Sequence, residues 1–348
     1  MFSQTEVAPG VINFAVGVPG KSLIPKNELD EAVAAATAAN SDAFMYQYAK
    51  IEGTQAFRAS VAALLRANGL THVGPENICA TFGNSLGLAT LAKIFARPCQ
   101  CVVVEEPTYF LAGKVFDDAG LRCVRIGVDG GGIQVDVLEA WLKSSKTKPA
   151  FVYCIPRHHN PTSVCLDEAR ETRLLALADE YDFMVVFDDP YRLLRYSNLS
   201  PAAAAAGVSE QALVHRRVLS LGSFSKILTP GLRLGWVIAA AENIKRICED
   251  GALNSGGGPP NVITEAVRLL IDSGKLQQHI ARVREELGAR AAALARAVQT
   301  HFKGRLSCRE CGAFSLSLSL SLSLSVSLFA CLSLCLSVSL SLSPSLIR

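Results

Sequence analysis

Residues 218–239 read VLSLGSFSKILTPGLRLGWVIA, and this stretch places a lysine in the loop between two predicted strands. The flanking runs, Val218–Leu221 and Leu234–Ala239, are short and apolar without clean alternation, which is typical of strands buried on both faces. The loop carries Lys226 among serine and threonine hydroxyls, with Arg233 seven positions further on. This set suits a phosphorylated aldehyde, because the amine forms a Schiff base while the hydroxyls and the guanidinium bind the phosphate. A serine-rich loop with a solvated lysine is the alternative interpretation.

The rest of the chain, up to about Gly312, alternates further apolar runs with amphipathic helical stretches. This pattern predicts an α/β fold with a largely parallel sheet. The other strand candidates are Cys101–Glu105, Ala150–Ile155 and Phe183–Phe187. Helical spacing predicts a helix over Asp167–Tyr181 with Asp167 as its N-cap, and another over Ala266–Phe302 that breaks near Asp272–Gly274.

Composition excludes several classes of protein. The 348 residues are 50% hydrophobic, which suffices for a large core, and the net charge of +3 gives no indication of nucleic-acid or membrane binding. Residues 1–10 do not resemble a secretory leader, so we expect a cytoplasmic protein whose 11 cysteines are reduced. The isolated CxxC at 308–311 is attributed to coincidence, and adjacent histidines at 158–159 point opposite ways in an extended segment, so no metal site is predicted.

Two polar motifs follow predicted strands at the edge where open α/β sheets bind ligands. Asp188-Asp-Pro-Tyr191 comes directly after Phe183–Phe187, and Asn160-Pro-Thr comes after Ala150–Ile155. Each could also be a plain turn, because aspartate, asparagine and proline are common turn residues.

In this order and spacing, the motifs resemble those of the class I and II aminotransferases, most closely the branch of the α-aminoadipate and kynurenine aminotransferases. The resemblance covers about 13–312. It implies the pyridoxal 5'-phosphate (PLP)-dependent transferase fold, in which a three-layer α/β/α large domain with a mostly parallel sheet is joined by an α+β small domain. The small domain would be incomplete here. The implied boundaries are an amino-terminal segment 1–40, a large domain 41–255, a partial small domain 256–314 and a low-complexity tail 315–348.

The resemblance assigns catalytic roles to three residues and a contact to a fourth. Lys226 would form the internal aldimine and move the substrate proton, and Asp188 would face the pyridine nitrogen. Tyr191 and Asn160 would both hydrogen-bond the phenolic oxygen of the ring. Ser163 occupies a position where the family usually has glycine, so a turn with positive φ would be strained there.

The resemblance also assigns cofactor contacts outside the catalytic group. TFGNSLGL at 81–88 opens a predicted helix and resembles the family's phosphate cup, with Asn84-Ser85 in place of the usual Ser-Gln. Ser223, Ser225 and Arg233 would complete the phosphate site. Tyr109 would stack on the cofactor ring, with core packing as the alternative, and Tyr48 would reach the neighbouring subunit of a homodimer.

The carboxyl-terminal region departs from the family. Residues 315–346 form an uncharged, Ser-Leu-rich run with the period of a β-strand, and they resemble a translated CT-dinucleotide repeat. The family carries an arginine here that clamps the substrate carboxylate, whereas this sequence has no basic residue between Arg309 and Arg348.

The resemblance therefore implies a ping-pong aminotransferase of amino acid metabolism or biosynthesis, acting on an amino acid and a 2-oxo acid. Two alternatives remain open: a PLP-binding homologue impaired by the altered carboxyl terminus, and another fold-type-I PLP enzyme such as a lyase or a decarboxylase. A transcriptional regulator built on this fold would need an amino-terminal DNA-binding domain, and the aminotransferase pattern begins almost at residue 1.

Overall fold

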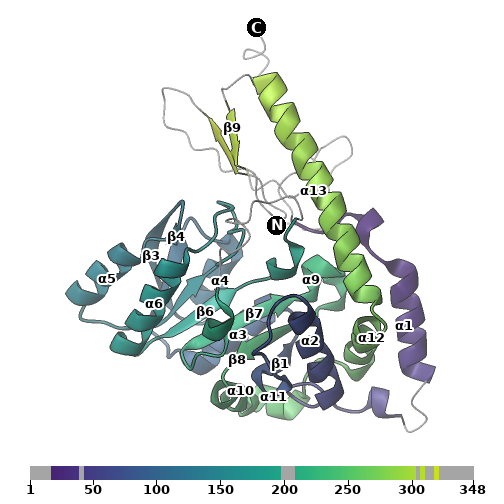
Figure 1. The fold of residues 1–348 in the computed structure, drawn as a ribbon. Helices are drawn as coiled ribbons and strands as arrows, with labels where there is room; N and C mark the ends of the chain where they lie inside the picture. Colours follow the sequence, from purple (N-terminus) through teal and green to yellow (C-terminus); the bar gives the residue numbers. More distant parts are fainter. Residues whose placement is uncertain (1–16, 39–42, 197–207, 303–305, 310–316, 321–348) are drawn as a thin grey trace.

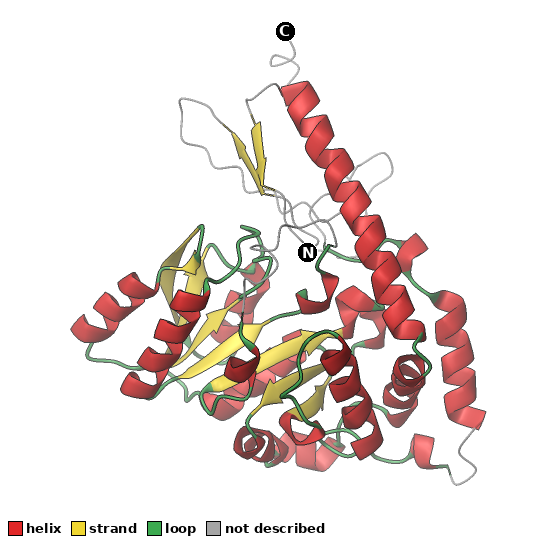
Figure 2. Cartoon of the chain, viewed as in Figure 1, coloured by secondary structure: helices red, strands yellow, loops and turns green. Residues whose placement is uncertain are grey.

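A computed structural model describes residues 17–38, 43–196, 208–302, 306–309 and 317–320. An eight-stranded sheet with the order β1-β8-β7-β6-β5-β2-β3-β4 lies at its centre, between helices on both faces (Figures 1 and 2). The strands of this sheet are β1 Ile78–Thr81, β2 Cys101–Glu106, β3 Arg122–Asp129, β4 Gly132–Ile133, β5 Pro149–Cys154, β6 Met184–Asp188, β7 Val218–Ser223 and β8 Gly235–Ala239.

The middle of the sheet is parallel, from β3 through β2, β5 and β6 to β7. β8 lies antiparallel between β7 and β1, and β4 pairs antiparallel with β3 at the opposite edge. The α/β prediction with a mostly parallel sheet is thus confirmed, and all five strand candidates coincide with strands to within two residues at each end.

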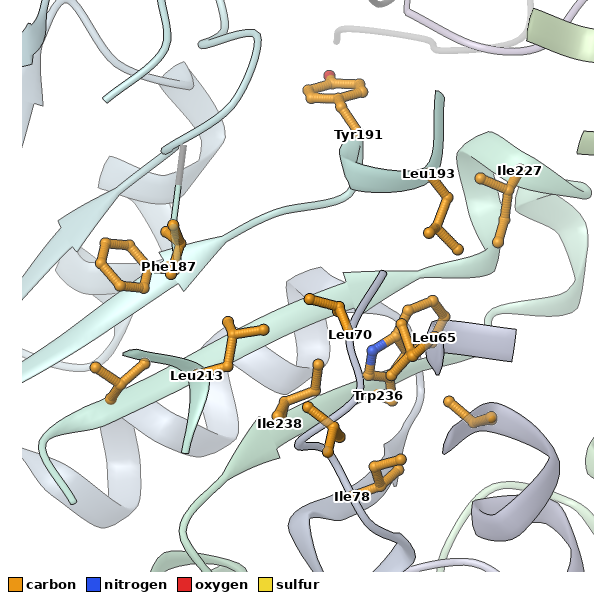
Figure 3. Close-up of a cluster of buried hydrophobic side chains, with 14 of the residues drawn as sticks. Leu65, Leu70, Ile78, Phe187, Tyr191, Leu193, Leu213, Ile227, Trp236 and Ile238 are labelled. Atoms are coloured by element: carbon orange, nitrogen blue, oxygen red, sulfur yellow. The ribbon is translucent and has the colours of Figure 1, made fainter. Parts of the chain in front are cut away.

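Successive residues of the central strands contact different helical layers, because side chains alternate across a strand. On β5, Val152 and Cys154 belong to the cluster that includes α2, α6 and α12, whereas Phe151 and Tyr153 belong to the cluster under α3, α4 and α10. This explains why the strand is apolar along its whole length. Figure 3 shows the first cluster, in which Trp236 and Ile238 of β8 lie beside Leu65 and Leu70.

Two predicted helical stretches are found: α6 covers the first to within one residue, and α12 and α13 cover the second, with α12 beginning five residues earlier, at Asn261. The described helices are α1 Lys26–Ala38, α2 Gln55–Ala67, α3 Asn84–Phe95, α4 Phe110–Asp118, α5 Val135–Ser144, α6 Glu168–Tyr181, α8 Glu210–Leu213, α9 Phe224–Ile227, α10 Ala241–Cys248, α11 Gly251–Gly256, α12 Asn261–Asp272 and α13 Lys275–Phe302. Asp167 is the N-cap residue of α6, as predicted, although its side chain makes no capping hydrogen bond. None of the described helices is both long and apolar enough to span a bilayer.

The predicted break between the last two helices is confirmed. α12 ends at Asp272, Gly274 adopts φ 74°, and α13 starts at Lys275. Glycine accepts this left-handed conformation without a steric penalty. α1 packs along α12 although more than 200 residues separate them, and α13 extends beyond the sheet (Figure 1).

Beyond α13, a two-stranded antiparallel sheet joins β9 Leu306–Arg309 to β10 Ser317–Leu320. The strand period of the Ser-Leu run is therefore confirmed over four residues of backbone. The remainder of the run, 315–316 and 321–346, lies outside the described residues, as does Cys311 of the CxxC motif.

Candidate active site

The loops after three neighbouring parallel strands converge at one edge of the sheet. Asp188 is the last residue of β6, Lys226 follows β7 in the short helix α9, and Asn160 lies in the loop after β5. The carboxyl ends of adjacent parallel strands share an edge, which is where open α/β sheets bind ligands. The motifs singled out in the sequence thus come together in space.

Asp188 is a buried carboxylate held by two donors. Its side chain is 9% exposed. Oδ1 accepts a hydrogen bond from Nδ2 of Asn84 at 2.7 Å, and Oδ2 accepts one from the hydroxyl of Tyr153 at 2.8 Å. Burial raises the pKa of Asp188 and the neighbouring charge of Asp189 adds to this, while the two donors and the positive charge of Lys226 oppose it.

Lys226 is oriented by the geometry of the turn that follows β7. Ser223 caps α9 by accepting a 3.0 Å hydrogen bond from the backbone N–H of Ser225, and both serines are buried. The ammonium group of Lys226 donates to the carbonyl of Gly17, in the segment before α1. The lysine therefore projects from the sheet edge toward the amino-terminal segment.

A cradle for an anion lies at the amino terminus of α3, whose first residue, Asn84, contacts Asp188. Gly83 precedes the helix with φ 80°, and a Cβ at this position would lie 3.0 Å from Nη2 of Arg233. The first intrahelical hydrogen bond runs from the N–H of Gly87 to the carbonyl of Gly83, so the amides before Gly87 point outward without intrahelical acceptors. Outward amides, a helix dipole and a guanidinium fit a phosphate group.

Two further atoms around the cradle favour a bound group. Oγ1 of Thr81 and Oδ1 of Asn84 are buried and have no hydrogen-bond partner among the described residues. Both face Gly235, where a Cβ would lie 3.0 Å from the first atom and 3.1 Å from the second. Buried polar atoms without partners are costly, so they favour a ligand or a water at this position.

Two tyrosines border the site from different loops. Tyr109 precedes α4 and packs against the cluster under that helix, which is compatible with the core-packing alternative. Its pKa is raised by burial and by the charge of Asp188 and lowered by that of Arg233. Tyr191 is buried at the end of the β6 loop, and its hydroxyl points away from the apolar cluster (Figure 3).

The turn after β5 contains the strained serine that the sequence suggested. Ser163 adopts φ 62°, so the position does require the left-handed region where glycine is favoured. His158 also has a positive φ, 47°, which corrects the expected extended conformation of the histidine pair. The two imidazoles nevertheless have different surroundings, because His159 faces Glu105 while His158 lies near Arg157 and Asp189.

The sequence analysis did not identify the buried residues that contact and position the site residues. Tyr153 is fully buried and holds Asp188, and Glu105 of β2 forms a buried pair with His159 of the loop after β5. The sequence did offer a signal for Tyr153, because this tyrosine lies in a strand predicted to be buried on both faces. A buried tyrosine hydroxyl usually has a hydrogen-bond partner, so a polar group was to be expected beside it.

Comparison with known proteins places this geometry in a family. The family model for aminotransferase class I and II matches residues 9–322. The chain belongs to this family. It is therefore a PLP-dependent enzyme of amino group transfer, as the sequence motifs had suggested.

Individual relatives agree with this assignment. An aromatic-amino-acid aminotransferase of Thermococcus litoralis is 31% identical over 293 residues, which cover 83% of this aminotransferase and 68% of the relative. The solved kynurenine aminotransferase of Pyrococcus horikoshii, in complex with PMP, superposes with a TM-score of 0.79 at 29% identity, covering 91% of this chain and 78% of that one. The solved α-aminoadipate aminotransferase of Thermus thermophilus is complexed with N-(5'-phosphopyridoxyl)-L-leucine. It superposes with a TM-score of 0.77 at 28% identity, and the match covers 90% of this chain and 77% of that one.

Not all predicted site residues meet within one copy of this aminotransferase. Tyr48 is 82% exposed and Tyr46 is 74% exposed, and both lie in the segment that precedes α2. Ser85 lies in the exposed first turn of α3. The structure thus shows Tyr48 on the surface of the chain.

Proposed function

We propose that this aminotransferase moves an amino group from an amino acid to a 2-oxo acid by a ping-pong mechanism, with Lys226 as the residue that binds the cofactor and transfers the proton. One observation carries the proposal. The Lys226 ammonium and the buried Asp188 carboxylate lie close enough to interact electrostatically, at the sheet edge beside an anion cradle. These three groups suit a phosphorylated pyridine aldehyde: the lysine would bind the aldehyde, the carboxylate would face the ring nitrogen, and the cradle would bind the phosphate.

PLP, when bound, supplies an aldehyde for the amine and a ring that withdraws electrons from the substrate Cα. Asp188 would accept a hydrogen bond from the protonated ring nitrogen, and Tyr191 and Asn160 would donate to the phenolic oxygen. Arg233, Ser223, Ser225, Asn84 and Ser85 would bind the phosphate. Tyr109 would cover one face of the ring and exclude water.

Lys226 would act in the proton transfer once the substrate amine has displaced it. The free amine would take the proton from Cα as a general base and return it to C4' as a general acid. The orientation of α9 supports this role, because the capping hydrogen bond of Ser223 and the Gly17 contact fix both ends of the lysine side chain. The products of the two half-reactions would be a 2-oxo acid and a new amino acid, with Lys226 as the residue that moves the proton in both directions.

A homodimer in the cytoplasm is the form that we propose for the active protein, without nucleic-acid or membrane partners. The exposed Tyr46 and Tyr48 support the dimer, because large exposed aromatics are typical of interaction surfaces. Tyr48 would then reach the phosphate in the neighbouring subunit. Seven free cysteines among the described residues are compatible with a reducing compartment.

The second candidate function is a PLP-binding homologue with little turnover. It is favoured by the sequence after Arg309, which has no basic residue before Arg348 for a substrate carboxylate. A bidentate arginine orients the Cα–H bond as well as binding the substrate, so its loss would slow the proton transfer. We expect this chain to transaminate far more slowly than a relative that carries the carboxylate-binding arginine.

Absorbance of the purified full-length protein tests both candidates. Addition of PLP should produce the visible band of a lysine-bound cofactor. Loss of that band on adding kynurenine, 2-aminoadipate or tyrosine shows the first half-reaction, and its return on adding 2-oxoglutarate shows the second. A band that persists with every amino acid favours the homologue with little turnover, and a protein that gives no band contradicts both.

A further inference from the structure

Each oxygen of the Asp188 carboxylate is held by a separate neutral donor. Asn84 reaches Oδ1 from the start of α3, and Tyr153 reaches Oδ2 from the interior of β5. These residues lie 104 and 35 positions away from Asp188 in the chain. A carboxylate only accepts hydrogen bonds, so the Asn84 amide must present Nδ2 and the Tyr153 hydroxyl must donate its proton.

The surroundings of Asp188 otherwise favour the neutral acid. Burial raises the pKa of this carboxyl, and the negative charge of Asp189 raises it further. Asp189 is itself paired with Arg192, whose Nε lies 2.6 Å from Oδ2. The hydrogen bonds from Asn84 and Tyr153 act in the opposite direction, since hydrogen bonds to the charged form stabilise it.

A protonated Asp188 would bind the ring nitrogen of the cofactor more weakly than the carboxylate would. Only the ionised form attracts a protonated ring nitrogen, and only a fixed carboxylate plane directs an oxygen toward it. Tyr153 is 0% exposed, so its ring cannot shift readily, and the Asn84 backbone is fixed in the first turn of α3. Each oxygen keeps a second lone pair for the ring nitrogen.

We propose that Asn84 and Tyr153 are positioning residues that keep Asp188 ionised and oriented for the ring nitrogen of the cofactor. This inference rests on the proposed function, because it takes Asp188 as the group that faces that nitrogen. It also gives Asn84 a role beyond the phosphate cradle: its backbone belongs to the cradle, while its side chain serves the opposite end of the cofactor.

The test compares two ligands in the cofactor-free full-length protein. One ligand is PLP, and the other is its carbocyclic analogue, in which C–H replaces the ring nitrogen. Both keep the phosphate and the aldehyde, so the ratio of their Kd values isolates the contact at the nitrogen. We would measure the ratio from pH 5.5 to 8 by fluorescence titration of the wild type, Tyr153→Phe and Asn84→Leu.

The wild type should prefer PLP over the analogue. Each variant should reduce this preference about tenfold, which corresponds to about 1.4 kcal/mol, because Asp188 loses one of the two donors that stabilise its charged form. The remaining preference should disappear at a higher pH in the variants than in the wild type, because a carboxyl that loses a donor has a higher pKa. Binding of the analogue should change little in Tyr153→Phe, which a general loss of structure would not reproduce.

Tyr196→Phe serves as the matched control, because it removes a hydroxyl from another buried tyrosine. It should leave the ratio and its pH dependence unchanged. A wild type that binds neither ligand contradicts the proposed function itself. A wild type that prefers PLP, with variants that keep the same preference at every pH, overturns only the positioning role. Asn84 is partly exposed, so Asn84→Leu disturbs the core less than Tyr153→Phe does. If Tyr153→Phe does not fold, the ratio measured for Asn84→Leu still tests the positioning role.

Discussion

Nε2 of His159 lies 3.1 Å from Oε2 of Glu105, and both side chains are almost completely buried. The backbone N–H of Thr162 donates to Nδ1 of His159, so the imidazole proton lies on Nε2, facing the carboxylate. Glu105 also accepts a 2.7 Å hydrogen bond from the N–H of Ile155. The pair thus connects the loop that leads to Tyr109 with the loop that carries Asn160.

We expect Glu105→Ala to destabilise the protein by about 2 kcal/mol, because it leaves the buried N–H of Ile155 without an acceptor and removes the carboxylate that faces His159. Glu105→Gln should cost less, since its amide oxygen can still accept from Ile155. Urea unfolding measures the free energy of unfolding of both variants and of the wild type. Glu106→Ala is the control, because this neighbour is exposed and its 3.1 Å pair with Arg125 is a surface ion pair. Equal stability of the two alanine variants would show that the buried pair contributes nothing.

Lys226→Ala should abolish covalent attachment of the cofactor. No other lysine is flanked by the hydroxyls at the end of β7, so no other amine replaces it. Reduction with borohydride followed by peptide mass spectrometry identifies the modified residue. The exposed Lys245→Ala should retain the adduct at Lys226. An unchanged adduct in Lys226→Ala would show that the assignment is wrong.

Asp188→Ala should still bind PLP, because the cradle and the lysine remain. Proton abstraction should slow on the order of 10²–10³-fold, since a ring without a carboxylate partner stabilises the carbanion poorly. Single-turnover stopped-flow measurements with saturating amino acid report this step. A variant with the wild-type single-turnover rate would refute the assigned role.

Ser163→Gly should stabilise the turn after β5. At φ 62° a side chain with a Cβ is strained, by about 1 kcal/mol, and glycine removes the strain. Ser163→Ala keeps the Cβ and removes only the hydroxyl, so the comparison of these two variants isolates the strain. We expect the glycine variant to melt at the higher temperature of the two. The reverse order would mean that the turn tolerates the Cβ without cost.

The stability of the folded chain should fall in acid because of His158. Burial and the charge of Arg157 lower the pKa of His158 from 6.5 to about 4. Between these values the unfolded chain binds the proton and the folded chain does not, so stability is lost as the pH falls. The loss approaches about 1.4 kcal/mol per pH unit.

Unfolding at pH 7 and pH 5 compares the wild type with His158→Asn, since asparagine tolerates the positive φ at this position. Between pH 7 and pH 5, the free energy of unfolding of the variant should fall by about 2 kcal/mol less than that of the wild type. His301→Asn, at an exposed helical position, is the control. An identical loss in wild type and His158→Asn would contradict the assignment.

The strands and the principal motifs could be predicted because their signals are local. Val218–Leu221 and Phe183–Phe187 are uninterrupted apolar runs, and buried parallel strands require this composition. Asp188 follows its run directly and Lys226 follows its run after four residues, so their position at the sheet edge follows from the chain order. The break after Asp272 could be predicted from glycine in the same way.

The contacts of Asp188 could not be predicted in this way. Asn84 and Tyr153 meet it only because β5 lies beside β6 and because α3 starts next to the same sheet edge. Likewise, Glu105 of β2 and His159 of the loop after β5 are 54 positions apart in the chain but meet because β2 and β5 are neighbours in the sheet. Local composition fixes which residues form a strand, whereas strand order decides which distant side chains share a buried space.

The sequence by itself determined the α/β class, the position of the lysine and the order of the cofactor motifs, because apolar period and turn chemistry act over a few residues. Only the tertiary structure decided that Asp188 is held by two neutral donors and that Ser163 occupies a left-handed turn. It also decided that Tyr48 lies on the surface of the chain. Burial, hydrogen bonding and the charge of a buried carboxylate depend on partners far away in the chain, and these partners meet only when the sheet has formed.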